Sequence, residues 1–126
     1  MSWTLDNEEN RFEIPNAEKL RQYLHEFHQH AQQKPVIVTL NAPDKSCLAI
    51  GLGRDLSVLN YIAPGGWPAL HVVGDEANDG VIDYMCFGQF SQIPARNTIP
   101  IDRAIEAAVE FFNSGKLAEA LQWEND

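Results

Sequence analysis

Five short apolar runs follow one another between residues 36 and 87, with only about three to seven residues between them. The runs are rich in β-branched and aromatic residues, and the breaks hold proline, glycine, asparagine or aspartate, so the pattern predicts strands joined by turns. Consecutive parallel strands need a crossover of about a dozen residues or more. The short connections therefore predict an antiparallel meander and exclude a doubly wound parallel sheet. The predicted strands are residues 36–40, 47–52, 57–62, 69–73 and 81–87.

A helical period precedes these strands and another follows them. From residue 17 to about 33, apolar residues recur at spacings of three and four, directly after Asn16, a residue type that caps helix starts. A second such pattern begins after Pro100, with Asp102 in its first turn and Gly115 at its end. Both patterns predict amphipathic helices that bury one side against the sheet.

The remaining segments carry weaker patterns. Residues 1–15 read as a possible arm or edge strand, residues 89–100 as an extended, proline-broken connection, and the tail after Gly115 as one more turn held by apolar contacts. The length of 126 residues fits one domain. We therefore expect a single α+β domain over residues 1–126, an antiparallel β-meander of about five strands with an N-terminal and a C-terminal helix packed on one face.

The charge balance restricts the partners. The formal net charge is -9 and the pI is near 4.7, so the surface repels nucleic acid and anionic lipid and favours basic partners. The N-terminal residues show no signal sequence, and the apolar runs are too short to span a membrane, which predicts a cytoplasmic protein. Cys47 and Cys86 sit inside apolar runs and are expected to be buried thiols rather than a disulfide.

Motifs for chemistry are weak. The glycines Gly51 and Gly53 echo a phosphate-binding loop, but a strand follows them where such a loop needs a helix. His25 and His28 are three residues apart and could share a metal ion, with His30 nearby, yet no third ligand follows at motif spacing. No serine lies in a nucleophile elbow. We therefore predict no catalytic residues, no metal and no cofactor, and hence no enzyme.

A partner-binding surface is the more specific prediction. Asp75, Glu76 and Asp79 crowd one loop, Asp55 lies in a neighbouring turn, and Trp67 lies in a loop rich in proline and glycine. An exposed aromatic side chain can anchor a basic partner while nearby carboxylates steer it. The alternative reading is that Trp67 folds back on the core and the acids only confer solubility.

The C-terminal half carries a recognisable pattern of aromatic, glycine and proline positions. The pattern consists of Tyr84 to Gly88, Ile93-Pro94, Ile99-Pro100, Ala104 to Ala108 leading into Glu110-Phe111-Phe112, Gly115 and Trp123. On it the chain resembles the first-numbered immunity-protein family (Imm-one) of bacterial polymorphic toxin systems, over roughly residues 16–124. The strands 50–51 and 57–61 are similar to the middle strands of that family.

The resemblance implies a cytoplasmic inhibitor of a secreted toxin domain, often a nucleic-acid deaminase, and it transfers no catalytic or contact residues. Such a toxin must attract phosphates, so its cleft is expected to be basic, which suits an acidic inhibitor. We therefore expect the partner to be a cognate toxin domain, and neither a nucleic acid nor a membrane. Two alternatives remain open, an acidic chaperone or adaptor for a secreted effector and a small ligand-binding protein.

Overall fold

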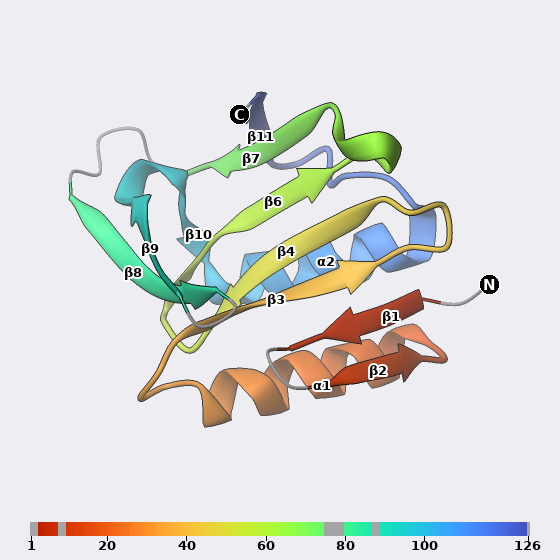
Figure 1. Ribbon diagram of the computed structural model, residues 1–126, viewed down its shortest axis with the longest axis horizontal. Coiled ribbons are helices and arrows are strands. Elements are labelled where there is room, and N and C mark those ends of the chain that lie inside the picture. Colours follow the sequence, from red (N-terminus) through yellow and green to blue (C-terminus); the bar gives the residue numbers. More distant parts are fainter. Residues whose placement is uncertain (1–2, 8–9, 75–79, 87–88, 126) are drawn as a thin grey trace.

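The computed structural model describes residues 3–7, 10–74, 80–86 and 89–125, with only the backbone described at 85–86 and 89–91. Two α-helices and eleven strands lie in these parts of the chain (Figure 1). The helices are α1 (Ala17–His30) and α2 (Ile101–Ser114). The strands are β1 (Trp3–Asp6), β2 (Arg11–Ile14), β3 (Val36–Asn41), β4 (Cys47–Leu52), β5 (Leu56–Ser57), β6 (Leu59–Ile62), β7 (Ala69–Val73), β8 (Val81–Cys86), β9 (Gln89–Pro94), β10 (Ile99–Pro100) and β11 (Gln122–Asn125).

The main sheet runs in the order β11-β7-β6-β4-β3-β1-β2. The predicted meander is confirmed for β3, β4, β6 and β7, which pair antiparallel in sequence order. The α+β class is confirmed as well, although the sheet has more strands than the five expected. The segment 1–15 contributes a hairpin, β1–β2, on one side, and the tail contributes β11, not a turn, on the other.

The fifth predicted strand does not continue the meander. It forms β8, which pairs with β9 and meets β3 through one parallel bridge between Val36 and Met85. The argument from short connections holds only for consecutive strands, and β3 and β8 are far enough apart in the chain for a parallel contact. The segment expected as an extended connection supplies β9. The hairpin β8–β9 thus crosses one end of the sheet (Figure 1).

Local signals set the helix ends. The side-chain oxygen of Asn16 accepts a hydrogen bond from the backbone N–H of Lys19 at 2.8 Å, so α1 begins where the cap predicts. The helix ends at His30, three residues short of the predicted end. At the end of α2, Gly115 has φ of 72° and donates its N–H to Phe111, a left-handed cap that glycine favours.

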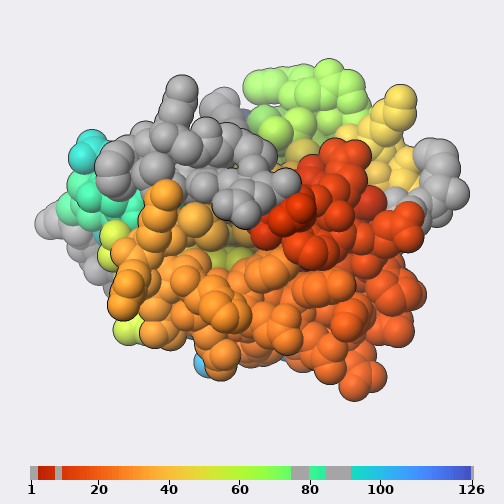
Figure 2. Space-filling model, turned by 60° about the horizontal axis from the view of Figure 1, so that its bottom comes forward, coloured from red at the N-terminus to blue at the C-terminus, as the bar shows by residue number. Residues whose placement is uncertain are grey.

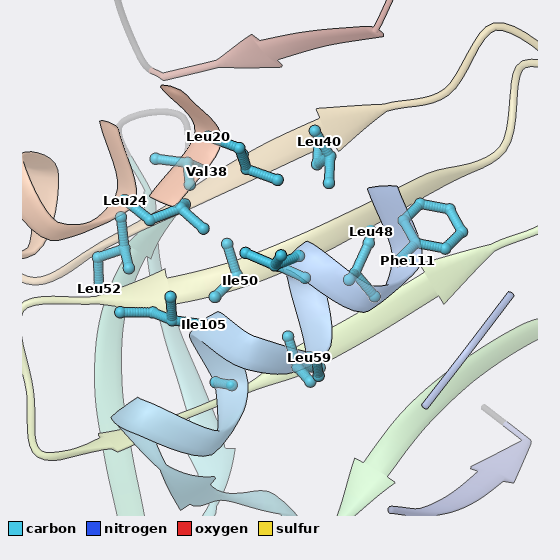
Figure 3. Packing of buried hydrophobic residues seen from close by; sticks show 14 of the residues in the cluster. Leu20, Leu24, Val38, Leu40, Leu48, Ile50, Leu52, Leu59, Ile105 and Phe111 are labelled. Atoms are coloured by element: carbon cyan, nitrogen blue, oxygen red, sulfur yellow. The ribbon is translucent and has the colours of Figure 1, made fainter. Parts of the chain in front are cut away.

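Both helices cover the same face of the sheet. Leu20 and Leu24 of α1 and Ile105 and Phe111 of α2 point into one core with leucine and isoleucine side chains from β3, β4 and β6 (Figure 3). Each fully buried side chain of this size contributes about 1.5–3 kcal/mol. The hairpin β1–β2 extends the sheet, and it lies beside α1, where Phe12 contacts Tyr23 and Phe27 (Figure 2). The ring of Trp3 meets the ring of Phe111 edge-on at 5.2 Å.

Among the residues that the structure describes, only one end of the opposite face of the sheet is covered. There the hairpin β8–β9 packs on a small second cluster of Ile37, Val58 and Tyr84. The Tyr84 ring lies against Gly51, where a Cβ would come within 2.7 Å of the ring, so this glycine is required by close packing. The Tyr84 hydroxyl donates to the carbonyl oxygen of Leu56, which ties β8 to the start of β5.

Candidate partner-binding surface

The uncovered part of this face, which we call the open face, is turned toward the reader in Figure 1. Strand registers place its side chains in two rows that cross the main sheet, because alternate residues of a strand point to opposite faces. The first row is Arg11, Asp6, Thr39, Ala49, Asn60, His71 and Glu124, and the second row is Glu13, Thr4, Asn41, Cys47, Ile62 and Ala69.

Charged side chains of the open face lie on its outer strands. At one rim, Arg11 Nε lies 2.8 Å from Asp6 Oδ1, and Asn41 Nδ2 donates to the other oxygen of Asp6 at 3.1 Å. The hydrogen bond from Arg11 is the main cause that lowers the pKa of Asp6. At the opposite rim, Oε2 of Glu124 lies 3.2 Å from Nη2 of Arg96, and its Oε1 lies 3.3 Å from Nε2 of His71. The centre of the face, on β3, β4 and β6, carries uncharged side chains.

The hairpin β8–β9 forms a wall along one end of the open face. A hollow of about 290 Å³ lies where the wall meets the floor. Its lining combines apolar side chains, two amide groups and one histidine. The lining residues are Val58, Asn60, His71, Ile93, Pro94 and Asn97.

Trp67 lies at the other end of the open face, in the loop between β6 and β7. The loop is closed by a hydrogen bond from Ala63 N to Pro68 O at 3.0 Å. Trp67 is 69% exposed, so it does not fold back on the core. Ile62, the last residue of β6, is 38% exposed on the open face beside it. Two of the three exposed large hydrophobic side chains found in the described residues thus share one corner.

Asp55 lies at the end of the sheet opposite Trp67. The first residue of β4, Cys47, pairs with the last residue of β6, Ile62, so the loop that holds Trp67 lies next to the start of β4. Asp55 follows the other end of β4. A strand of six residues spans about 20 Å. The length of the sheet therefore separates Asp55 from Trp67. Asp75, Glu76 and Asp79 lie outside the described residues.

A second carboxylate, which the sequence analysis did not select, lies beside Asp55. Asp83 of β8 and Asp55 line one hollow of about 340 Å³ together with Arg54 and Val81, which is 58% exposed. We call Asp55 and Asp83 the acidic end. Arg54 Nε donates to the carbonyl oxygen of Asp83 at 2.8 Å, which holds the arginine against β8. Neither carboxylate is in an ion pair within the described parts of the chain.

The three histidines have separate environments. His28 Nδ1 accepts a hydrogen bond from Gly53 N at 2.8 Å, His30 Nδ1 lies 2.9 Å from the carbonyl oxygen of Glu26, and His25 is exposed on α1. Within the segments that the structure describes, no three histidine, cysteine or acidic residues are grouped to hold a metal ion. His28 thus has a structural role that sequence spacing did not indicate.

Cys47 is half-buried and has a free thiol, rather than being fully buried as expected. It lies on the open face, since its neighbours Leu48 and Ile50 point into the core between sheet and helices. Burial raises the pKa of its thiol. The side chain of Cys86 lies outside the described residues.

In the described parts of the chain, neither helix combines the length and apolar character needed to cross a membrane.

Comparison with known proteins gives the family. No curated protein sequence matches the chain. The family model described as Immunity protein Imm1 matches residues 8–125, nearly the whole chain. The match includes every strand of the main sheet except β1, and both helices. The chain therefore belongs to the Imm1 family of immunity proteins, whose members protect against a toxin.

Proposed function

We propose that this protein works in the cytoplasm, where it binds a cognate nucleic-acid deaminase toxin and inhibits it by occluding the toxin's substrate cleft. Membership of the Imm1 family is the observation that carries the proposal, because it implies a toxin as the partner. The nature of the toxin and the manner of inhibition are our inference from charge and shape.

Charge supports a basic, nucleic-acid-binding partner. A deaminase must attract a phosphate backbone, and a positively charged cleft does this. A protein of net charge -9 is attracted to such a cleft and repelled by the substrate. The acidic end has two exposed carboxylates that form no ion pair in the described parts of the chain, beside the single cation Arg54, so we expect it to meet the basic cleft early.

Inhibition by occlusion needs no catalytic group on the inhibitor. A standard interface of about 800 Å² per partner is enough to exclude a substrate when it covers the cleft. Complementary charge raises the association rate, and buried contacts lower the dissociation rate. The described residues offer both kinds of group, carboxylates at the acidic end and an exposed tryptophan at the other end of the sheet.

The test measures association with the purified toxin domain encoded beside this chain. The double variant Asp55→Asn/Asp83→Asn removes two charges from the acidic end, and Glu18→Gln/Glu26→Gln removes two exposed charges from α1. We expect the first variant to lower the association rate several-fold more than the second and to weaken its dependence on salt. Equal rates in the two variants would remove the acidic end from the proposal.

Assays of toxin activity on DNA and RNA test the two remaining parts of the proposal, deamination and its inhibition. We expect base deamination to stop when one equivalent of this chain is added. A complex that leaves the toxin active would identify a chaperone or adaptor instead, and an active nuclease would replace the deaminase. The triple variant Asp75→Lys/Glu76→Lys/Asp79→Lys should slow association further. This prediction concerns residues outside the described structure.

A further inference from the structure

We infer that the toxin docks on the open face and that Trp67 is the anchor, inserting into an apolar pocket of the toxin. The inference rests on the proposed function and adds to it the surface that makes the contact. The occupant is a folded, basic protein domain with an apolar depression near its cleft.

The open face is the uncovered side of a sheet whose other side carries both helices and the main core. Its central strands present only uncharged side chains, so a partner can cover them without removing a charge from water. The centres of protein interfaces are depleted in charged residues for this reason. The central side chains are Thr39, Ala49, Asn60, Asn41, Cys47 and Ile62.

The rims of the open face support the same reading. Asp6 is satisfied by Arg11 and Asn41, and Glu124 by Arg96, so these carboxylates require no partner from the toxin. Charged groups that are paired at the edge of a contact and remain in water cost little. The face therefore has an uncharged centre and a polar rim, as a protein interface does.

Trp67 provides the anchor that a flat sheet lacks. A tryptophan left 69% exposed contributes little to folding, yet buried tryptophans are among the most frequent hot spots of interfaces. Ile62 extends the apolar corner onto the floor of the open face. The wall and hollow made by β8–β9 at the far end would receive a projecting part of the toxin.

The size of the face agrees with a specific complex. Strands β1, β3, β4, β6 and β7 have four to six residues each and lie about 4.8 Å apart, so together they present on the order of 400 Å² before side-chain relief is counted. A tryptophan side chain buries about 150–250 Å² more. With the hollow beside β9, the area approaches the roughly 800 Å² that each partner of a standard complex buries.

Charge complementarity favours the toxin over a second copy of this chain. Two copies, each with net charge -9, repel one another, whereas a basic domain is attracted. The acidic end lies beyond the β8–β9 wall, separated from the Trp67 corner by at least the length of β4, about 20 Å. That distance fits within one standard interface, so steering at one end and anchoring at the other can serve a single contact.

The test introduces an arginine on each of the two faces of the molecule and, in a third variant, removes the Trp67 side chain. Ile62→Arg places a large charged side chain on the open face, and Gln22→Arg places one on the exposed side of α1, so both variants change the net charge equally. We expect Ile62→Arg and Trp67→Ala each to weaken toxin binding about 30-fold or more, mainly through faster dissociation. Gln22→Arg should change binding less than about 2-fold, and thermal unfolding should show all three variants folded.

Cys47 offers a readout that needs no substitution. Its thiol lies on the floor of the open face, so alkylation followed by peptide mass spectrometry reports access to that floor. We expect the toxin to slow alkylation of Cys47 about 10-fold or more. Acylation of Lys19 on α1 in the same samples should be unchanged.

The outcomes separate the inference from the proposed function. If the wild-type chain binds and inhibits the toxin while Ile62→Arg and Trp67→Ala behave like Gln22→Arg, the docking surface is wrong and the function stands. Protection of Cys47 without toxin, together with dimerisation that depends on Trp67, would assign the face to a second copy and overturn the inference. A wild-type chain that binds no toxin would refute the proposed function itself.

Discussion

The backbone N–H of Gly53 donates to Nδ1 of His28 at 2.8 Å and thereby joins the last turn of α1 to the turn that follows β4. Gly53 has φ of 105°, and a Cβ at this position would lie 2.3 Å from the carbonyl oxygen of Ala31. The position therefore excludes side chains for two reasons, an unfavourable backbone conformation and a direct overlap with the helix end.

Gly53→Ala should lower the free energy of unfolding by about 3 kcal/mol or more, because it combines both penalties. Gly65→Ala is the matched control, since Gly65 also has positive φ, 87°, but no atom within 4 Å of its Cβ position. We expect about 1 kcal/mol for the control. Urea denaturation measures both, and similar losses would show that the overlap with Ala31 is relieved at no cost.

Stability should fall as pH rises above about 10, because burial raises the pKa of Tyr84 to about 12, above its usual value near 10. Between these values the unfolded chain releases the phenol proton and the native chain keeps it, so the contribution present below pH 10 is lost as pH approaches 12. The loss is about 2 kcal/mol.

Tyr84→Phe separates this effect from the titration of other groups. The variant should be about 1 kcal/mol less stable at neutral pH, because the hydrogen bond to Leu56 is missing. Above pH 10 the difference from the wild type should shrink. If the free energies of unfolding of the variant and the wild type fall in parallel above pH 10, the Tyr84 hydroxyl is not the group that causes the loss of stability.

The N-terminal hairpin should loosen at acid pH. The hydrogen bond from Arg11 is the largest effect on the pKa of Asp6 and lowers it. Burial raises this pKa by less, and the hydrogen bond from Asn41 lowers it further. A group with a lowered native pKa stabilises the fold above its ordinary value of 3.8 and loses that contribution as pH falls through the native pKa. Protection factors of the β1 and β2 amides, which correct for the pH dependence of intrinsic exchange, should therefore fall below pH 4, and Asp6→Asn should remove this fall.

Two tryptophans should separate stability from binding. Trp3 is half-buried against Phe111 and Phe112, with ring centroids 5.2 and 5.1 Å away, so Trp3→Ala should cost about 3 kcal/mol of stability. Trp67→Ala should change stability by less than about 0.5 kcal/mol, because the side chain is 69% exposed. Calorimetric unfolding of the two variants gives the comparison, and a large loss in Trp67→Ala would contradict the isolation of that side chain.

Local patterns predicted most of the elements. The cap at Asn16, the glycine at Gly115 and the runs of β-branched residues located both helices and the central strands, although α1 ends three residues early and the predicted strand 57–62 divides into β5 and β6. β11 was missed because Gln122–Asn125 has a single apolar residue and depends on pairing with the distant β7. β9 was missed because its pairing with β8, and not its composition, makes it a strand.

The relative placement of the candidate residues follows from meander geometry, which the sequence analysis did not apply to them. Successive connections of an antiparallel meander lie at alternate ends of the sheet, so the turn that holds Asp55 and the next loop, which holds Trp67, must be at opposite ends. The sequence contained this information. It also contained Asp83, which alternates with the inward-pointing Ile82 and Tyr84 and is therefore exposed.

The pairing of β11 with β7 has a consequence for how the protein is made. Trp123 lies opposite Val72, and Leu5 lies opposite Leu40, so strands at both flanks of the sheet join segments distant in the chain. Pairings of this kind close large loops and slow folding. On a ribosome, β7 must wait for nearly the entire chain to emerge before its outer neighbour exists. The outer edge of β7 therefore stays unpaired until residues 122–125 have been synthesised.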